Sequence, residues 1–324
     1  MAKGLVTVFG ANGFLGRFVL RALVKDGWRI RAAVRRPHTA QDLRVIGGVG
    51  QIQIVQANIR FQNSVRSALE GADAVINLVG IPYKKGRQTF GAVHEVGPKA
   101  IAATAKDLGI TNVVHLSALG AQEVADSDYL RSKARGERAL QDIIPSADIM
   151  RPALMFGEGD KLFSLAARLV PLSPIVPLFG GGKTRLQPVY VGDVASAISS
   201  SVGRGTNGKI YELAGPTSYT AKQLWQFTLK AIDKKRVLLP VPMFMGKIMG
   251  FALEFWGAIP LVNLLIKPVL TRDMVKALKQ DYVPADNMPG LTDFGITPET
   301  IEAIVPPTLE TFKKYGQFHI QSAG

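Results

Sequence analysis

The sequence predicts an α/β fold in which a doubly wound parallel sheet is covered by helices on both faces. Two observations support this prediction. Short apolar runs alternate with helix-like segments through the first half of the chain, which is the pattern of repeated strand–helix–strand units. The first apolar run, residues 5–9, also leads through a glycine-rich turn directly into a helical pattern. Right-handed crossovers between such units would wind the chain over both faces of the sheet.

Each expected element follows from a short apolar run or from helical spacing. The expected strands are residues 5–9, 30–34, 53–56, 74–79, 113–117 and 148–150. The expected helices are residues 15–25, a short piece near Asp42, 65–69, 93–107 and 130–142. Later in the chain, Thr220 is expected to cap a helix over 221–232, and prolines are expected to start short helices at 298–304 and 307–315.

The turn after the first strand has three glycines in the spacing Gly-x-x-Gly-x-x-Gly. Gly10 can take a backbone shape that other residues avoid, Gly13 lets the chain approach a bound group, and Gly16 lets the helix pack on the strand. The helix start then offers free N–H groups to a phosphate. The alternative is an ordinary strand–helix turn. The pattern favours a dinucleotide-binding Rossmann domain. The residues expected to contact the dinucleotide here are Gly10, Asn12, Gly13, Phe14, Leu15 and Gly16.

The end of the second strand indicates which dinucleotide is bound. Sites for NAD place an acidic side chain about 20 residues after the glycines, on the ribose 2′-hydroxyl. In this chain Arg35 and Arg36 occupy the end of the second strand, and the first acidic residue after it is Asp42. Because an arginine suits a 2′-phosphate by charge and by its fork of donors, the sequence predicts NADP(H). Alternatively, one or both arginines face solvent.

Further contacts are expected where later strands end. Asn58 and Ile59 follow the third strand and could flank the adenine. The backbone of Leu78, Val79 and Gly80 closes the fourth strand and would pass the adenine-side ribose. The basic run 84–87 follows at once, either as a solvated face or toward the ligand.

Tyr129 and Lys133 would carry any chemistry. At i and i+4 they project from one helical face. A neighbouring ammonium favours the phenolate, so we expect Lys133 to lower the pKa of Tyr129 from its usual value of about 10. Lys133 could also bond the nicotinamide ribose while Tyr129 passes a proton. The alternative is a chance spacing on an exposed helix.

These motifs together resemble the short-chain dehydrogenase/reductase superfamily, in its extended or atypical branches. The resemblance covers about residues 4–215 and includes the segments 151–157 and 187–195. It implies catalytic roles for Ser117, Tyr129 and Lys133, and it adds those three residues and Pro152 to the expected cofactor contacts. The family commonly has a second hydroxyl residue beside the serine, whereas Ala118 follows Ser117 here. That departure puts turnover in doubt and leaves cofactor binding untouched.

A narrower resemblance covers nearly the whole chain. Residues 9–16, 129–137 and 211–216 are similar to the Rossmann-type accessory subunit of respiratory complex I and its bacterial relatives. The resemblance implies a tightly held NADPH with a structural role, complex I subunits as partners, and a cytoplasmic position at the inner face of a bacterial inner membrane, or the matrix side in a mitochondrion. The alternative function is an active NADPH-dependent reductase, epimerase or dehydratase acting on a small substrate.

Composition narrows the possible partners. Lys and Arg (39) exceed Asp and Glu (25), giving a net charge of +14. This favours an anionic partner: a phosphorylated cofactor, an acidic protein surface or an anionic membrane surface. We find no nucleic-acid recognition motif, so no nucleic acid is expected. The chain has no cysteine, which excludes thiolate catalysis, and its four histidines have no metal-ligand spacing, so no metal site is expected. The N-terminus runs straight into the first strand, so we expect no leader segment.

The second half is expected to form a smaller lobe. We predict a NADP(H)-binding Rossmann domain over 1–155 and a C-terminal lobe over 156–324, with about 186–215 returning to the first domain. The apolar stretch 243–270 is either core of the lobe or a docking surface that includes Phe251, Phe255 and Trp256. Its longest uncharged run, 255–266, has 12 residues, short of the roughly 20 needed to span a membrane, so no transmembrane segment is expected.

Overall fold

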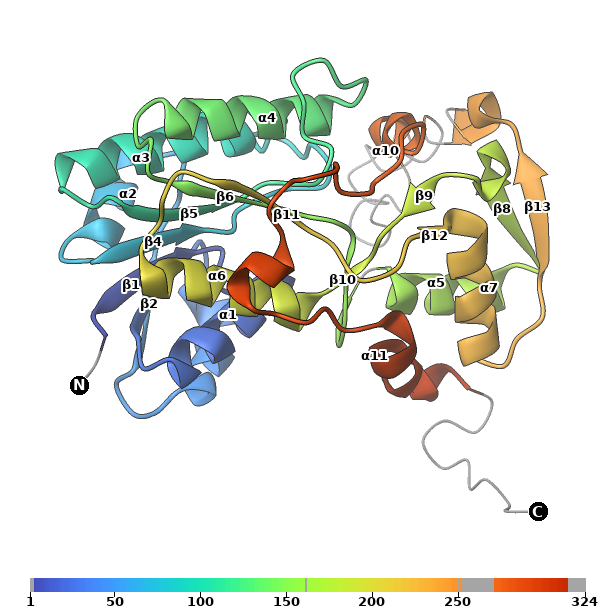
Figure 1. The fold of residues 1–324 in the computed structure, drawn as a ribbon, viewed down its shortest axis with the longest axis horizontal. Coiled ribbons are helices and arrows are strands. Elements are labelled where there is room, and N and C mark those ends of the chain that lie inside the picture. Colours follow the sequence, from blue (N-terminus) through green and yellow to red (C-terminus); the bar gives the residue numbers. More distant parts are fainter. Residues whose placement is uncertain (1–2, 161, 247, 250, 252–270, 314–324) are drawn as a thin grey trace. The chain divides into compact units, whose positions relative to one another are not determined.

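The structure, a computed structural model of the 324-residue chain, describes residues 3–160, 162–246, 248–249, 251 and 271–313 (Figure 1). The chain divides into two compact units. The first unit comprises residues 1–152, 191–214 and 284–298, and the second comprises 153–190, 215–283 and 299–324. Residues 284–298 belong to the first unit, although no local pattern in the sequence predicts this.

The first unit is built on a seven-stranded parallel sheet, which confirms the predicted fold class. The strand order is β11-β6-β5-β4-β1-β2-β3. The chain winds outward from β1 in one direction and from β4 in the other, as a doubly wound sheet requires. The strands are β1 (Leu5–Phe9), β2 (Arg29–Val34), β3 (Ile52–Gln56), β4 (Ala74–Asn77), β5 (Asn112–Leu116), β6 (Asp148–Pro152) and β11 (Ile210–Leu213).

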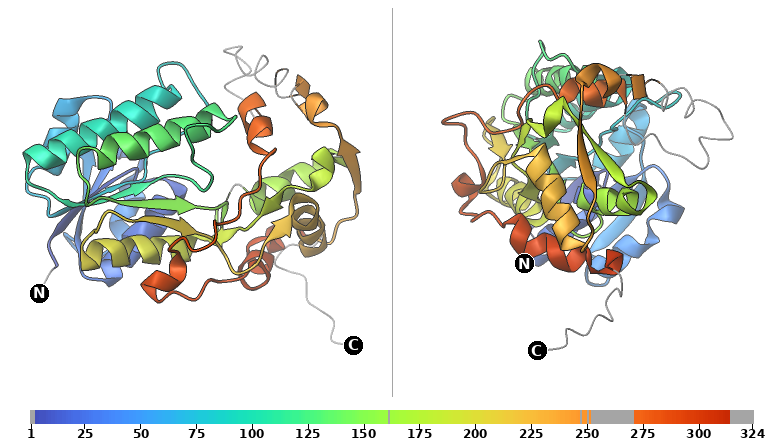
Figure 2. Two further views of the ribbon diagram at one scale, coloured as in Figure 1. Left: turned by 45° about the horizontal axis from the view of Figure 1, so that its top comes forward. Right: turned by 90° about the vertical axis from the view of Figure 1, so that its right-hand side faces the viewer.

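Helices cover both faces of this sheet (Figures 1 and 2). On one face α2 packs on α3 and α3 on α4, and on the other face α1 packs on α6. Buried apolar side chains such as Val75, Ile101 and Val113 join the first group of helices to the strands. The helices are α1 (Phe14–Lys25), α2 (Gln62–Leu69), α3 (Gly97–Asp107), α4 (Asp128–Gln141) and α6 (Val191–Arg204), with short turns η1 (Pro37–Thr39), η2 (Gln41–Ile46) and η6 (Leu291–Phe294).

The single helix expected over 93–107 is wrong at its first turn. A π turn, η3 (Gly91–Val96), precedes α3. Pro98 has no N–H to donate to the carbonyl four residues earlier, that of His94, so a regular α ladder cannot run through this point. A Cβ atom built on Gly136 of α4 would lie 1.8 Å from that same carbonyl oxygen. The π turn therefore meets α4 at a backbone contact that requires glycine.

Among its described residues, the second unit has three small pairs of strands around its own core. Phe156, Phe163 and Leu224 are among the buried side chains of that core. The pairs are β7 (Met155–Phe156) with β10 (Val189–Tyr190), β8 (Ile175–Phe179) with β13 (Val237–Val241), and β9 (Arg185–Leu186) with β12 (Tyr219–Thr220). The helices and turns are α5 (Phe163–Leu169), η4 (Val170–Leu172), η5 (Gly180–Gly182), α7 (Ala221–Ala231), α10 (Arg272–Ala277), α11 (Ile301–Thr308) and η7 (Glu310–Phe312).

Helix caps confirm one C-terminal prediction and correct two others. Thr220 caps α7, because its Oγ1 accepts the Gln223 N–H at 3.2 Å. The helix expected to begin at Pro298 begins at Ile301 instead, because Thr300 accepts the Ala303 N–H at 3.3 Å. The expected new start at Pro307 is wrong as well, since that proline lies inside α11.

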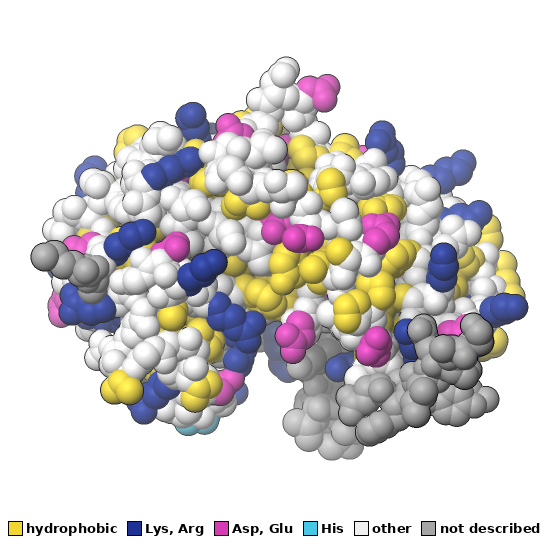
Figure 3. Space-filling model, turned by 60° about the horizontal axis from the view of Figure 1, so that its bottom comes forward, with side chains coloured by type: hydrophobic (Ala, Val, Ile, Leu, Met, Phe, Trp, Pro, Cys, Tyr) yellow, Lys and Arg dark blue, Asp and Glu magenta, His cyan; other side chains and the backbone are white. Residues whose placement is uncertain are grey.

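The apolar stretch 243–270 is described only as far as Phe251, apart from residues 247 and 250. Phe255 and Trp256 lie outside the described residues. Phe244, Ile248 and Phe251 are each more than half exposed. Across the described ranges, we find no helix with the length and hydropathy needed to span a bilayer. On the face shown in Figure 3, Lys and Arg side chains are spread among acidic and apolar ones rather than gathered in one place.

Candidate functional site

The strand order determines where a ligand site is expected. At the β1/β4 boundary the chain turns away in opposite directions, which in open α/β sheets leaves room for a ligand at the carboxyl edge. The register pairs Phe9 with Ala33 of β2 and with Asn77 of β4, so these three strands end level with one another. The glycine turn after β1 and the chain after β4 therefore meet at this edge.

Backbone geometry explains two of the three glycines. Gly10 has φ of +82°, and a Cβ atom there would lie 3.2 Å from the carbonyl carbon of Leu78. On Gly16 a Cβ atom would lie 2.4 Å from the carbonyl oxygen of Ala11. Gly10 thus allows the tight turn, and Gly16 allows α1 to pack against that turn, as the sequence predicts.

The start of α1 is open to an anion. Gly13 is the N-cap residue, so no side chain caps the helix, and the first turn has no acidic residue. The first intrahelical bond runs from the Arg17 N–H to the Gly13 carbonyl at 3.3 Å. The N–H groups of Phe14, Leu15 and Gly16 precede that bond. Asn12 and Gly13 are exposed at the tip of the turn, whereas the Leu15 side chain is buried.

Both arginines after β2 are exposed. The Arg35 guanidinium donates to Oε1 of Gln88 at 2.6 Å. Asp42, the first acidic residue after this strand, is paired with Arg17 at 2.5 Å, and the hydrogen bond from Arg17 lowers the pKa of Asp42. The carboxylate is therefore occupied by another cation, and Arg35 and Arg36 make none of the ion pairs found among the described residues.

The two residues proposed to flank the adenine have different environments. Asn58 is half-buried, and its Oδ1 accepts the Arg60 N–H at 3.2 Å. Ile59 is 6% exposed and belongs to the core beneath α2 and α3. A Cβ atom on Gly97 would lie 2.5 Å from Ile59 Cδ1, so this side chain fills the space that the glycine leaves. The structure therefore places Ile59 in the core and Asn58 at a turn.

The chain after β4 leads to the lysine of α4. The Leu78 N–H donates to the Phe9 carbonyl at 3.0 Å, and the Val79 N–H donates to Oδ1 of Asn77 at 3.1 Å. A Cβ atom on Gly80 would lie 3.4 Å from Nζ of Lys133. These bonds direct the chain after β4 past the glycine turn and on to Lys133.

Lys133, Gly80 and Ser117 come together at the end of β5. Lys133 is 3% exposed and donates to the Leu116 carbonyl at 2.9 Å. The adjacent Ser117 has a buried Oγ that finds no hydrogen-bond partner among the described residues. Pro152 closes β6, and its carbonyl accepts the Leu119 N–H at 2.9 Å. The structure thus brings the lysine and serine together from elements far apart in the sequence.

A histidine that the sequence analysis did not single out fixes the start of α4. His94 Nε2 accepts the Ile81 N–H at 3.0 Å, so the ring proton is on Nδ1, which lies 2.8 Å from Ser132 Oγ. That hydroxyl donates to the Tyr129 carbonyl at 2.7 Å. Phe90 stacks on the His94 ring, and both rings meet Tyr129 edge-on. Because these partners come from three segments, no local spacing could have revealed them.

A second buried histidine lies on β5. The Asn77 amide uses its oxygen for the Val79 N–H, so its NH₂ group donates to His115 Nδ1 at 3.0 Å. The proton of His115 is then on Nε2, which is buried with no hydrogen-bond partner among the described residues. His115 Nε2 and Ser117 Oγ are two unsatisfied polar atoms on the same side of β5.

Burial sets the protonation of the tyrosine and the lysine. It raises the pKa of Tyr129 to about 12. Burial also lowers the pKa of Lys133 to about 8, against the opposing charge of Glu137. The expected lowering of the Tyr129 pKa by Lys133 is wrong, because the ammonium is engaged by the Leu116 carbonyl while Phe90 and His94 desolvate the phenol. Tyr129 is therefore a phenol at neutral pH, suited to donating a proton.

Acid should destabilise the first unit through its two buried histidines. Burial, with the nearby charge of Lys133, lowers the pKa of His94 from 6.5 to about 2 and that of His115 from 6.5 to about 3. Between the pKa of each histidine in the folded chain and 6.5, the unfolded chain binds more protons than the folded chain. The stability that each neutral histidine contributes is therefore fully present above pH 6.5 and is lost as the pH falls. Each histidine contributes a slope of up to about 1.4 kcal/mol per pH unit. Denaturation of His94→Gln across this range should show a shallower slope, and the exposed His38→Gln should not. Equal slopes in all three proteins would contradict this assignment.

The residues at this edge fit a dinucleotide. A phosphate would meet the uncapped start of α1, where Gly13 presents no side chain. The unsatisfied Ser117 Oγ and the Lys133 ammonium lie farther along the sheet and offer a polar end for a second group.

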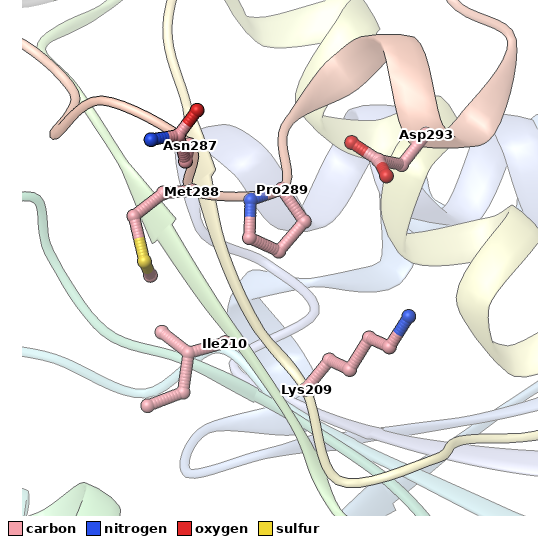
Figure 4. Close-up of a pocket in the computed structure, with 6 residues that line it drawn as sticks. All are labelled: Lys209, Ile210, Asn287, Met288, Pro289 and Asp293. Carbon is pink, nitrogen blue, oxygen red and sulfur yellow. The ribbon is translucent and has the colours of Figure 1, made fainter.

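Another pocket, of about 540 Å³, borders the edge strand β11 (Figure 4). Lys209, Ile210 and Asp293 help to line it, and no predicted site residue does.

Comparisons with known proteins agree with this geometry. The profile of an NAD(P)H-binding family matches residues 10–152. The mitochondrial NADH dehydrogenase (ubiquinone) 1 alpha subcomplex subunit 9 of Arabidopsis thaliana is 31% identical, over 97% of this chain and 79% of the relative. A ceramide reductase of Caulobacter vibrioides is 33% identical, over 61% of this chain and 60% of the relative. The crystal structure of an NADPH-dependent quinone oxidoreductase of Escherichia coli shares the fold, with a TM-score of 0.71, 20% identity, and coverage of 94% of this chain and 99% of that one.

The family follows from the extent of the first match. The identity of 31% spans both units and most of the relative. The NAD(P)H-binding profile, from Gly10 to Pro152, runs from the glycine turn to the end of β6. Both findings confirm the resemblances predicted from the sequence. The chain is an NAD(P)-binding Rossmann protein that belongs to the family of the complex I alpha subcomplex subunit 9.

Proposed function

We propose that this chain holds NADP(H) in its first unit and serves as a structural accessory subunit of a complex I-type NADH:quinone oxidoreductase. The observation that carries the proposal is the match to alpha subcomplex subunit 9 along 97% of the chain. The uncapped α1, the glycine turn and Lys133 support cofactor binding. Ala118 beside Ser117 supports a role without turnover.

The proposed partners and location follow from the same relatives. These relatives are mitochondrial NADH dehydrogenase subunits. We infer that this chain contacts complex I subunits at the cytoplasmic face of a bacterial inner membrane, or at the matrix side in a mitochondrion. The exposed apolar side chains of Phe244, Ile248 and Phe251, together with the net charge of +14, support a peripheral position on a protein or an anionic lipid surface.

NADP(H) is proposed over NAD(H) because two exposed arginines follow β2 and the nearby Asp42 is paired with Arg17. Replacing Arg35 and Arg36 by alanine should weaken NADPH binding by about 1.5–3 kcal/mol, the range for a hydrogen bond to a charged group, and leave NADH binding unchanged. Isothermal titration of both nucleotides at one salt concentration measures this. Equal affinities of the unaltered chain for NADPH and NADH would overturn the preference.

A second candidate function is reduction of a small substrate. The ceramide reductase match, together with Tyr129 and Lys133 on one face of α4, favours it. Bound NADPH would supply a hydride. Lys133 would orient the nicotinamide end, and the Tyr129 phenol, protonated at neutral pH, would give its proton to the reduced carbonyl oxygen.

Assembly and cofactor retention distinguish the two functions. If the role is structural, Tyr129→Phe should leave both unchanged, because the hydroxyl is needed only for proton transfer. Lys133→Met should loosen NADPH, and the exposed Lys99→Met on α3 should not. Native electrophoresis of detergent-extracted membranes, followed by assay of NADPH in the assembly, measures both. A purified soluble chain whose carbonyl reduction falls by about 10²–10⁴-fold in Tyr129→Phe would instead establish the reductase.

A further inference from the structure

Three loops converge beside the glycine turn at the carboxyl edge of the sheet. Arg35 follows β2 and Arg60 follows β3. The chain after β4 forms a hairpin, residues 84–88, in which Lys85 and Gln88 exchange backbone hydrogen bonds at 3.0 Å. We call this segment the basic hairpin, because its sequence is Lys-Lys-Gly-Arg-Gln.

The basic hairpin is tied to each neighbouring loop by a polar contact. Gln88 accepts from the Arg35 guanidinium at 2.6 Å, and the Arg87 carbonyl accepts from the Arg60 guanidinium at 3.0 Å. At its other end, Lys84 Nζ lies 3.3 Å from a carboxylate oxygen of Asp128, at the start of α4. The hairpin therefore connects the loops after β2 and β3 with the helix that carries Tyr129.

The groups that accept hydrogen bonds from Arg35, after β2, and from Arg60, after β3, carry no charge. Arg35, Arg60 and Arg87 take part in none of the ion pairs within the described part of the chain, whereas the exposed Arg66 pairs with Asp107 at 2.9 Å. Guanidinium groups held close together by an amide and a carbonyl keep their full positive charge. A dianionic phosphate monoester, with three acceptor oxygens, matches such a set of forked donors.

The position of the cluster separates it from the diphosphate site. The start of α1 directly follows β1, whereas the cluster lies where β2 and β3 end, one and two strands farther along the sheet. Because β2 and β3 lie on the opposite side of β1 from β5 and Lys133, the cluster is at the end remote from the proposed nicotinamide position.

The geometry points to Gln88 and Arg60 as further residues that determine specificity for a phosphate monoester on the adenosine ribose, with the basic hairpin as the third side of that subsite. This inference rests on the proposed binding of NADP(H). The phosphate takes the place of Gln88 Oε1 on the Arg35 guanidinium, and the Gln88 amide then has its NH₂ group to donate. Arg60, held by Asn58 and Arg87, adds a second guanidinium.

A charge placed at Gln88 gives a sharp test. Gln88→Glu sets a carboxylate against Arg35, so NADPH and the probe adenosine 2′,5′-bisphosphate should bind about 10- to 100-fold more weakly, the equivalent of one lost charged hydrogen bond. NADH, which has a ribose hydroxyl there, should bind unchanged or more tightly. Gln122→Glu, an exposed glutamine outside the cluster, makes the same change in net charge and should alter none of the three affinities.

A second pair of variants tests the arginine. Arg60→Gln should weaken NADPH selectively against NADH, and Arg66→Gln should not. Equal losses for NADPH and NADH, or equal losses in Gln88→Glu and Gln122→Glu, would mean general electrostatics and would overturn the subsite. If the unaltered chain binds NADPH and all four variants bind it normally, this inference fails and the proposed cofactor stands. If the unaltered chain does not bind NADPH, both fail.

Discussion

Gly136→Ala should destabilise the first unit by more than about 3 kcal/mol, beyond the usual range for overpacking. The added Cβ atom would lie 1.8 Å from the His94 carbonyl oxygen, and both partners are backbone-fixed. Helix propensity alone predicts the opposite sign, since alanine normally stabilises a helix by about 1 kcal/mol relative to glycine. The effect should also disturb the proposed site, because α4 carries Tyr129 and Lys133.

Chemical denaturation of the purified chain measures this change. Arg135→Ala, at the preceding residue of α4, is the matched control; its side chain is 57% exposed and its contact with Glu95 is 3.7 Å long. Its free energy of unfolding should change by no more than about 0.5 kcal/mol. A Gly136→Ala variant as stable as the unaltered chain would show that α4 and the π turn are not in backbone contact.

Arg151→Met should cost about 3–5 kcal/mol, the range for breaking a buried ion pair from one side. The Arg151 guanidinium on β6 forms two hydrogen bonds with Glu137 of α4, at 2.6 and 3.0 Å, and lies 3.5 Å from Glu212 of β11. Both carboxylates are less than one-tenth exposed. Without the arginine, two negative charges remain buried with no cation between them.

The measurement is the same denaturation, repeated at several pH values. The loss of unfolding free energy caused by Arg151→Met should become smaller as the pH is lowered, because protonation removes the two uncompensated charges. Arg138→Met is the control, since its 3.4 Å pair with Glu123 is exposed and should contribute at most about 1 kcal/mol. Similar losses of unfolding free energy in Arg151→Met and Arg138→Met would argue against a special role for the buried ion pairs of Arg151 with Glu137 and Glu212.

Local patterns were enough to predict six of the seven strands of the sheet, and β11 was missed. The alternation of apolar runs and helical spacing identified β1 to β6 and α1 nearly to the residue, because each of these elements buries its own periodic face. The conformation of Gly10 and the close packing of Gly16 were predictable for the same reason, since both depend on residues near them in sequence.

The parts that sequence did not reveal depend on distant partners. The π turn depends on Gly136, 42 residues after His94, and Ile59 is buried because it fills the space beside Gly97. The Tyr129 pKa was misjudged because the spacing to Lys133 shows a possible neighbour but not the desolvation by Phe90 and His94. Gln88 went unnoticed because its contact with Arg35 joins two loops that are 53 residues apart.

The placement of β11 has a consequence for synthesis of the chain. This strand and α6 complete the first unit, but residues 153–190 of the second unit are made before them, and residues 284–298 are made much later. On the ribosome, β6 therefore remains an edge strand with an open ladder until β11 has emerged. A protein shortened after residue 152 would keep that open edge permanently and leave α1 without its neighbour α6, so we expect such a fragment to aggregate.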